Sequence, residues 1–260
     1  MTSNEDDGRP ERTRRHRLGP GQALRDLDDA AAFVEEMGLV LQTPHPYLPS
    51  LFGAVQGKPA KAGVGGFGDW PEHAWSWAGE LAEREDMLLT KTVLGRRTLV
   101  HRRLWAALDA AVRGCAVQGG AKDDEQRILG VLAKVERLRT DVLRDRAGFP
   151  AGSTGTKVFQ KAMGRLESLG LVLSRPVLVD QHKHVAIAEL WERRFLAPLS
   201  KERGVEPWVM AALVAAGGAP ENDVLKWFAW PRKETLDALV RLESEGKIGR
   251  DGGVLRVFPS

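Results

Sequence analysis

One stretch in the second half of the chain places basic side chains at a spacing that suits phosphate binding. Three basic residues follow one another at four-residue intervals, Lys157, Lys161 and Arg165, so on a helix they share one face. We expect no nearby acidic residue to screen their charges. Hydroxyl side chains occupy the predicted start of this helix: Ser153, Thr154 and Thr156. Helix starts and hydroxyl groups favour phosphate oxygens, so the pattern indicates contact with a nucleic-acid backbone.

Other predicted contacts stand at hairpins and at a later helix. They are Arg96 and Arg97 at a turn, Arg175 at a strand end, His182, Lys183 and His184 at a hairpin tip, and Arg232 and Lys233 at the later helix start. The two histidines have no further ligand nearby, so we expect no metal. Acidic residues near Arg232 and Lys233 reduce the local positive charge, so the earlier helix is the better candidate for DNA contact. Three aromatic residues precede the later helix, Trp227, Phe228 and Trp230. We expect them to belong to the hydrophobic core, and the alternative is that they stack against DNA bases.

An internal repeat indicates which elements position these residues. The sequence RLESLG at 165–170 recurs 76 residues later as RLESEG at 241–246. In both copies an amphipathic helix runs into the motif, and a glycine ends it. The expected apolar faces are Ala162, Leu166 and Leu169 in the first copy, and Leu236, Leu239 and Leu242 in the second. Two helices precede each motif helix and a β-hairpin follows, which is the order of a winged helix, whose third helix usually enters the major groove.

The amino-acid composition restricts the class of protein but does not indicate one function. The chain has 260 residues, of which 43% are hydrophobic and 28% charged, as in a globular protein with a core. Its net charge of +3 permits nucleic-acid binding but does not demand it. Cys115 is the single cysteine, which excludes an intramolecular disulfide and a cysteine zinc site. The sequence shows neither a membrane span nor a secretory signal, so we expect a cytoplasmic, nucleoid-associated protein with no membrane partner.

Changes in composition predict four zones. Residues 1–22 are expected to be a disordered polar tail with a basic patch, either solvated or lying along phosphates as an arm. Residues 23–120 form a tryptophan-bearing N-terminal region, 123–199 a second unit and 204–260 a third. The expected fold is α+β and mainly α. In the N-terminal region we predict helices over 26–36 and 104–112, and strands over 39–42, 87–93 and 98–100.

The N-terminal region also carries a family pattern. Its parts are AAFV at 31–34, MGL at 37–39, LPSL at 48–51, WSW at 75–77, Leu81, and TKTVL at 90–94. This pattern resembles a branch of the bacterial winged-helix DNA glycosylases of the YcaQ/AlkZ type. With the order of the later helices and wings, the resemblance extends over residues 24–258. It implies three tandem winged-helix units around a DNA channel, and excision of alkylated bases, including bulky or crosslinking adducts. We expect the channel to be basic and the protein to use no cofactor.

The chain departs from this family where catalysis is expected. The glycosylases use a Gln-x-Asp or Gln-x-Gln motif to position or activate water at the sugar C1′, and the resemblance implies Gln42 as a shifted counterpart. No carboxylate stands two residues after it. Gln42, Thr43 and His45 could hold a water molecule, but none is a base as strong as an aspartate. Loop packing is the alternative role for each, so catalytic competence stays open.

Three functions remain as hypotheses. The first is a repair protein that binds double-stranded DNA as a monomer and either excises damaged bases or only recognises them. The second is a winged-helix transcription regulator with a specific operator. The third is a protein-interaction scaffold without a DNA role.

Overall fold

The computed structural model describes residues 9–59, 72–116, 121–180 and 183–258. Within these ranges the fold is α+β and mainly helical, with three small three-stranded sheets, which confirms the expected fold class. In the described residues, no helix combines the length and the apolar character that crossing a membrane requires.

The first repeat contains a helix, a strand, two helices and a hairpin. Its elements are α2 (Leu27–Met37), β1 (Leu39–Leu41), α3 (Leu51–Gln56), α4 (Glu72–Ala82), β2 (Met87–Val93) and β3 (Arg96–His101). Helix α2 begins where the Asp26 side chain accepts a hydrogen bond from the Asp29 N–H at 2.8 Å, and it ends at Gly38. The sheet has the order β1-β3-β2 with antiparallel pairs. The helix and strands predicted over residues 26–42 and 87–100 are therefore confirmed.

The same order of elements recurs twice, in the two units that contain the RLESLG and RLESEG sequences; these are the second and third repeats. The second repeat comprises α6 (Asp123–Leu132), β4 (Arg137–Arg139), α7 (Thr140–Arg146), α8 (Ser153–Ser168), β5 (Val172–Asp180) and β6 (Lys183–Leu190). The third comprises α10 (Glu206–Ala216), β7 (Ala219–Pro220), α11 (Glu221–Val224), α12 (Arg232–Ser244), β8 (Ile248–Asp251) and β9 (Val254–Val257). Their sheets run β4-β6-β5 and β7-β9-β8, so in each repeat the last strand lies in the middle.

Two details of the second and third repeats differ from expectation. Leu239 and Leu242 are buried as expected, but 39% of Leu236 is exposed, and Thr235 and Ala238 turn inward in its place. The three aromatic residues before α12 are buried, and the Phe228 and Trp230 rings stack at 4.4 Å, so they belong to the core and base stacking is the wrong alternative.

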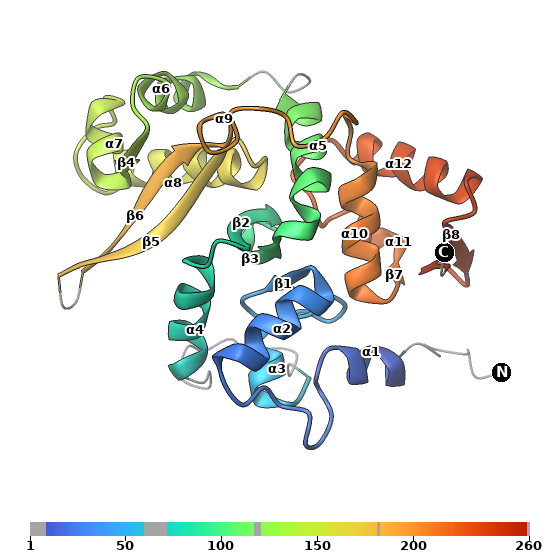
Figure 1. Cartoon of the computed structure of the whole chain (residues 1–260). Coiled ribbons are helices and arrows are strands. Elements are labelled where there is room, and N and C mark those ends of the chain that lie inside the picture. Colours follow the sequence, from blue (N-terminus) through green and yellow to red (C-terminus); the bar gives the residue numbers. More distant parts are fainter. Residues whose placement is uncertain (1–8, 60–71, 117–120, 181–182, 259–260) are drawn as a thin grey trace.

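Part of the expected tail is ordered. Helix α1 (Arg9–Arg15) lies against α10 of the third repeat (Figure 1). Arg15 donates to the Val214 carbonyl at 2.9 Å, and the buried His16 ring bonds to the Ala215 carbonyl at 2.9 Å. Arg14 pairs with Glu11, so these basic residues contact the protein itself rather than forming a free arm. Residues 1–8 lie outside the described part.

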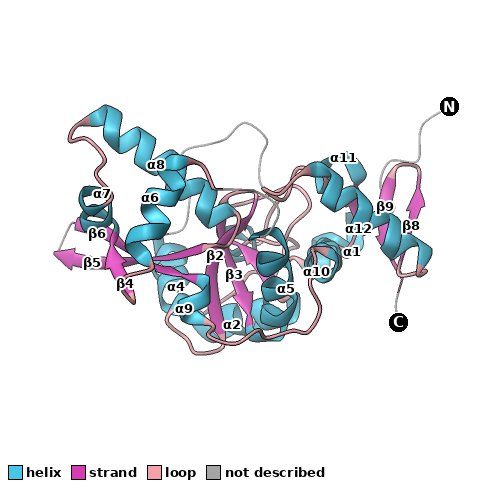
Figure 2. Cartoon of the chain, turned by 90° about the horizontal axis from the view of Figure 1, so that it is seen from above, coloured by secondary structure: helices cyan, strands magenta, loops and turns pink. Residues whose placement is uncertain are grey.

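The repeats pack into one body through shared cores. The first and third repeats join in a cluster that contains Leu39, Val100 and Leu108 from one side and Trp208 and Leu213 from the other. The second repeat has its own core, and its helix α8 extends from the outer edge of the molecule toward the hairpin β2–β3 (Figure 2). Helix α5 (Trp105–Ala116) runs between the second and third repeats, and the short helix α9 (Trp191–Arg194) links them (Figure 1).

A buried carboxylate connects α5 to this linking segment. Asp109 is fully buried and accepts hydrogen bonds from Arg113 Nε and Trp191 Nε1, both at 2.7 Å. Its second oxygen accepts from the Leu199 backbone N–H at 2.9 Å. Arg113 also donates to the Phe195 carbonyl at 2.7 Å. The network therefore joins α5, the helix that follows the first repeat, to the chain that runs from the second repeat to the third.

We expect Asp109→Ala to lower the free energy of unfolding by about 3–5 kcal/mol, because it leaves the buried Trp191 Nε1 without an acceptor and the partly buried Arg113 without its carboxylate. Urea denaturation measures the loss. Asp251→Ala is the control, because Asp251 forms an exposed ion pair with Arg256, and such pairs contribute at most about 1 kcal/mol. Equal stability of the two variants would show that the Asp109 network does not hold the repeats together.

Candidate nucleic-acid interface

The first turn of α8 depends on a close approach between two backbone segments. Gly152 precedes the helix with a φ of 93°, so neither Ser153 nor Thr154 caps it. A Cβ atom on Gly155 would lie 2.0 Å from the Pro150 carbonyl oxygen, which only glycine avoids. Ser153 and Thr154 are left exposed at the helix start.

Thr156 is already engaged within the protein. Its hydroxyl donates to the Gly152 carbonyl at 2.8 Å and accepts from Arg144 Nη1 at 3.4 Å. Among the three predicted hydroxyl contacts, Thr156 therefore stabilises the turn between α7 and α8, while Ser153 and Thr154 face solvent.

The basic face of α8 consists of two lysines. Lys157 and Lys161 are exposed and form no ion pair with any described residue. Arg165 instead pairs with the buried Glu125 of α6, at 3.0 Å between Nη1 and Oε1. The prediction that no nearby acidic residue screens these three cations is thus wrong for Arg165, because Glu125 approaches it from another helix.

Most of the other predicted cations have partners in the fold. Arg175 pairs with Glu83 at 2.6 Å, and Arg96 donates to the Pro44 carbonyl at 3.1 Å. Arg232 reaches Asn222 at 3.4 Å, and Lys233 is exposed. His182 lies outside the described residues, as do the side chains of Lys183 and His184.

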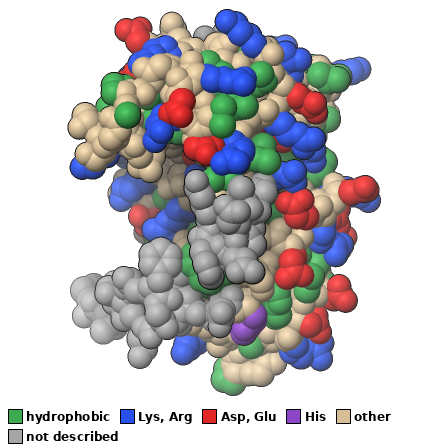
Figure 3. All heavy atoms as spheres, turned by 90° about the vertical axis from the view of Figure 1, so that its left-hand side faces the viewer, with side chains coloured by type: hydrophobic (Ala, Val, Ile, Leu, Met, Phe, Trp, Pro, Cys, Tyr) green, Lys and Arg blue, Asp and Glu red, His purple; other side chains and the backbone are tan. Residues whose placement is uncertain are grey.

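A hollow of about 480 Å³ lies where the first and second repeats meet. The hairpin β2–β3 contributes Lys91 and Arg97, α7 contributes Arg144, and α8 and the hairpin β5–β6 complete the wall. Neither Gln42 nor His45 is among the described residues that line it. Basic side chains gather over the upper part of the face that includes this second repeat (Figure 3). The hollow thus brings the predicted residues Arg97 and Thr156 together.

A carboxylate that we did not predict borders this hollow. Glu167 of α8 accepts from Lys91 Nζ at 2.6 Å and from the Ser174 hydroxyl, and only 7% of its side chain is exposed. It belongs to the repeated RLES sequence, which we interpreted as a helix end. The matching Glu243 pairs with Arg250 and is 36% exposed, so the repeat itself did not distinguish Glu167. Glu167 differs from Glu243 only because the first repeat, which carries Lys91, packs against α8.

Gln42 and His45 form hydrogen bonds within the first repeat. The buried Gln42 donates its backbone N–H to the Arg97 carbonyl at 2.8 Å. His45 Nδ1 accepts from the Tyr47 and Leu48 N–H groups at 3.2 and 3.1 Å. Burial, assisted by the Arg96 charge, lowers the pKa of His45 to about 4. The neutral ring therefore carries its proton on Nε2, which leaves no ring nitrogen free to act as a base. This geometry favours the loop-packing role.

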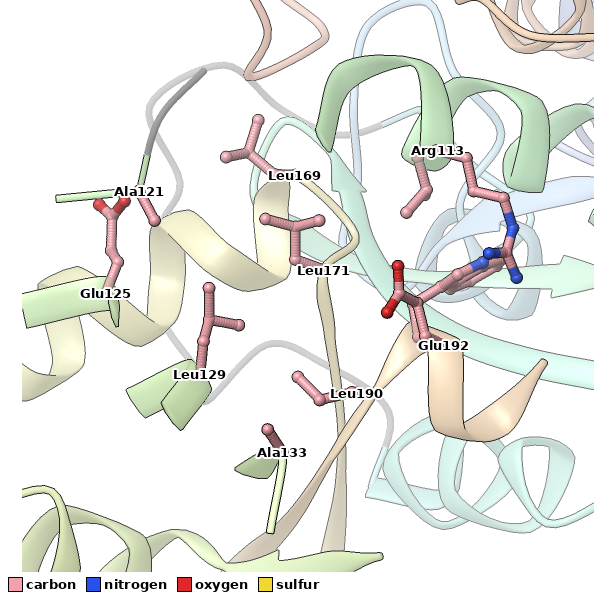
Figure 4. Close-up of a pocket in the computed structure, with 11 residues that line it drawn as sticks. Arg113, Ala121, Glu125, Leu129, Ala133, Leu169, Leu171, Leu190 and Glu192 are labelled. Atoms are coloured by element: carbon pink, nitrogen blue, oxygen red, sulfur yellow. The ribbon is translucent and has the colours of Figure 1, made fainter. Parts of the chain in front are cut away.

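A second cavity, of about 300 Å³, lies between α5, α6 and the strand ends of the second repeat (Figure 4). Leu129, Leu169 and Leu190 point into it, and Arg113 and Glu192 stand at one side. Its lining is mainly apolar, and two of its charged residues are already engaged, Arg113 with Asp109 and Glu125 with Arg165. Within the described part of the chain, no cluster of three or more His, Cys, Asp or Glu residues is placed to hold a metal ion.

Comparison with known proteins identifies the family. The profile of the AlkZ-related family matches residues 24–182, so the chain belongs to this family. Among solved structures, the chain is similar to the Streptomyces sahachiroi DNA glycosylase AlkZ, with a TM-score of 0.52 and 14% identity over 95% of this chain and 67% of that one. At this identity the likeness shows the fold alone. No curated protein sequence matches.

One buried and one partly buried histidine should make stability depend on pH. Burial lowers the pKa of both His16 and His45 to about 4, from an ordinary value of 6.5. Between these values the unfolded chain binds protons that the folded chain does not, so stability falls as the pH drops from about 6.5 to about 4. We expect His16→Gln to reduce this slope in urea denaturation series. Parallel slopes for the variant and the wild type would contradict the assignment.

Proposed function

We propose that the chain is a DNA-repair protein that binds duplex DNA and resembles a base-excision glycosylase. Family membership and the fold it shares with a protein named as a DNA glycosylase support this proposal. The observation that carries it is the outer face of α8, where Lys157 and Lys161 stand exposed without acidic partners among the described residues. Two cations one helical turn apart suit successive phosphates of a DNA backbone.

We infer that each repeat is a winged helix. A sheet in which the third strand lies between the first and second, with the hairpin after the third helix, is typical of that motif. The proposed units are 23–120, 123–199 and 204–260, with α8 as the helix that enters the major groove. The proposed channel lies along the second unit and the hairpin of the first.

The substrate we propose is an alkylated or crosslinked base in double-stranded DNA, bound by a monomer in the bacterial cytoplasm at the nucleoid. The resemblance of the N-terminal pattern to DNA glycosylases motivates this choice, and the lysines of α8 suit its backbone. Gln42 remains a proposed site residue because it directly follows β1 and donates its backbone N–H to the carbonyl of Arg97 on the neighbouring strand. The bonds of His45 favour a role in holding the loop.

Removing both α8 lysines should weaken DNA binding without changing the fold. For Lys157→Ala/Lys161→Ala we expect an affinity loss on the order of tenfold, and a decrease of about one per lysine in the slope of log affinity against log salt. Fluorescence anisotropy with a labelled duplex measures both. Lys226→Ala/Lys247→Ala is the matched control, because these lysines of the third repeat form ion pairs with acids. Unchanged affinity in the α8 variant would remove the main support for the proposal.

Base excision is tested on a duplex that carries one N7-methylguanine. We expect release of the base to leave an abasic site, which alkali cleaves into a shorter strand on a gel. Tight binding without strand cleavage would restrict the function to lesion recognition. Selection of one sequence motif from a random duplex library would instead favour a transcription regulator.

A further inference from the structure

The hollow between the first two repeats has the size and variety of lining expected of a binding pocket. Its volume of about 480 Å³ falls in the range of small-molecule sites, which is roughly 300–1,000 Å³. Two separate repeats form its wall, so it exists only while they remain packed together. It also adjoins α8, the helix whose outer lysines we assign to the DNA backbone.

The lining suits one nucleotide better than a stretch of backbone. Arg97 and Arg144 supply positive charge for phosphates, although Arg144 also pairs with Asp145 at 2.8 Å, and the Phe159, Met163 and Pro176 side chains offer apolar surface for a flat base. The carboxylate of Glu167 stands among them. A surface that only bound phosphates would gain nothing from this carboxylate, because it repels them.

Glu167 is held in place while keeping the capacity to accept a further hydrogen bond. Lys91 donates to one carboxylate oxygen at 2.6 Å, and Ser174 donates to the other. Each oxygen has two lone pairs, so one on each is left for a ligand or a water molecule. Lys91 comes from the first repeat and Ser174 from the second, so packing between the repeats fixes the carboxylate's orientation.

We propose that this hollow receives one nucleotide extruded from the duplex and that Glu167 is the general base for its hydrolysis. The inference rests on the proposed function. The C1′–N bond breaks and its electron pair leaves with the base, which departs neutral when it is an N7-alkylated purine. A water oxygen bonds to C1′, and the water proton moves to the Glu167 carboxylate. The carboxylate missing after Gln42 is thus supplied by a different repeat.

The first test compares Glu167→Gln with wild type in single-turnover removal of N7-methylguanine from a duplex. We expect the rate to fall about 100-fold or more, because a general base contributes that much, while the Kd for the duplex and the Tm stay near wild type. Glu206→Gln is the matched control, because Glu206 pairs with Arg241 at 2.6 Å in the third repeat, and its rate should be unchanged.

Each outcome of this test decides between the two ideas. If the wild type releases no base, the proposed function fails as an excision activity, and the role of Glu167 fails with it. If the wild type is active and Glu167→Gln equally so, only the role of Glu167 is overturned. A rate loss matched by losses in Kd and Tm would show that Glu167 is merely structural.

A second test examines the pocket without relying on catalysis. Gly164 lines the hollow, and a Cβ there meets no atom within 4 Å, so Gly164→Leu should fill the space without a backbone clash. Gly130→Leu is the control, since Gly130 is an equally open helical glycine that does not line the hollow. With 2-aminopurine at a mismatched position in the duplex, we expect fluorescence to rise for wild type and Gly130→Leu but not for Gly164→Leu. No rise with wild type, or equal rises in all three, would overturn the pocket assignment.

Discussion

The arrangement of the three repeats depends on the buried carboxylate of Asp109. It accepts hydrogen bonds from its own helix through Arg113, from the short linking helix through Trp191, and from the chain that leads to the third repeat through Leu199. A buried carboxylate is stable only when such donors surround it. Because α5 also packs on α10, the network and the shared apolar core together set the positions of all three repeats. The hollow between the first two repeats follows from that placement.

Local elements could be predicted from the sequence, because their signals lie within a few residues. The helix expected over residues 26–36 is α2 (Leu27–Met37), and the strand expected over residues 87–93 is β2 (Met87–Val93). The short strands β4 and β7 were not expected, because two or three residues carry no periodicity. They form because the hairpins β5–β6 and β8–β9 offer them an edge to pair with.

The candidate site was harder to predict than the fold, because its key contacts join distant residues. The pairing of Arg165 with Glu125 removed one expected contact, and the pairing of Lys91 with Glu167 created a site that no local spacing indicates. The repeated RLES sequence could not show that its two glutamates differ, since their surroundings come from other repeats. The two corresponding helices also differ outwardly, because α12 exposes Leu236 and Val240, whereas α8 exposes Lys157 and Lys161 beside one large apolar residue, Val158.

The docking of α1 on α10 also affects how the protein can be handled. Helix α1 and the hairpin β8–β9 lie on one side of the molecule, whereas α7, α8 and the hairpin β5–β6 lie on the other (Figure 1). A purification tag or a fluorophore fused near either end of the described chain would therefore stand far from the hollow. Immobilisation through either end would leave the second repeat facing solution, which suits surface-based measurements of DNA association.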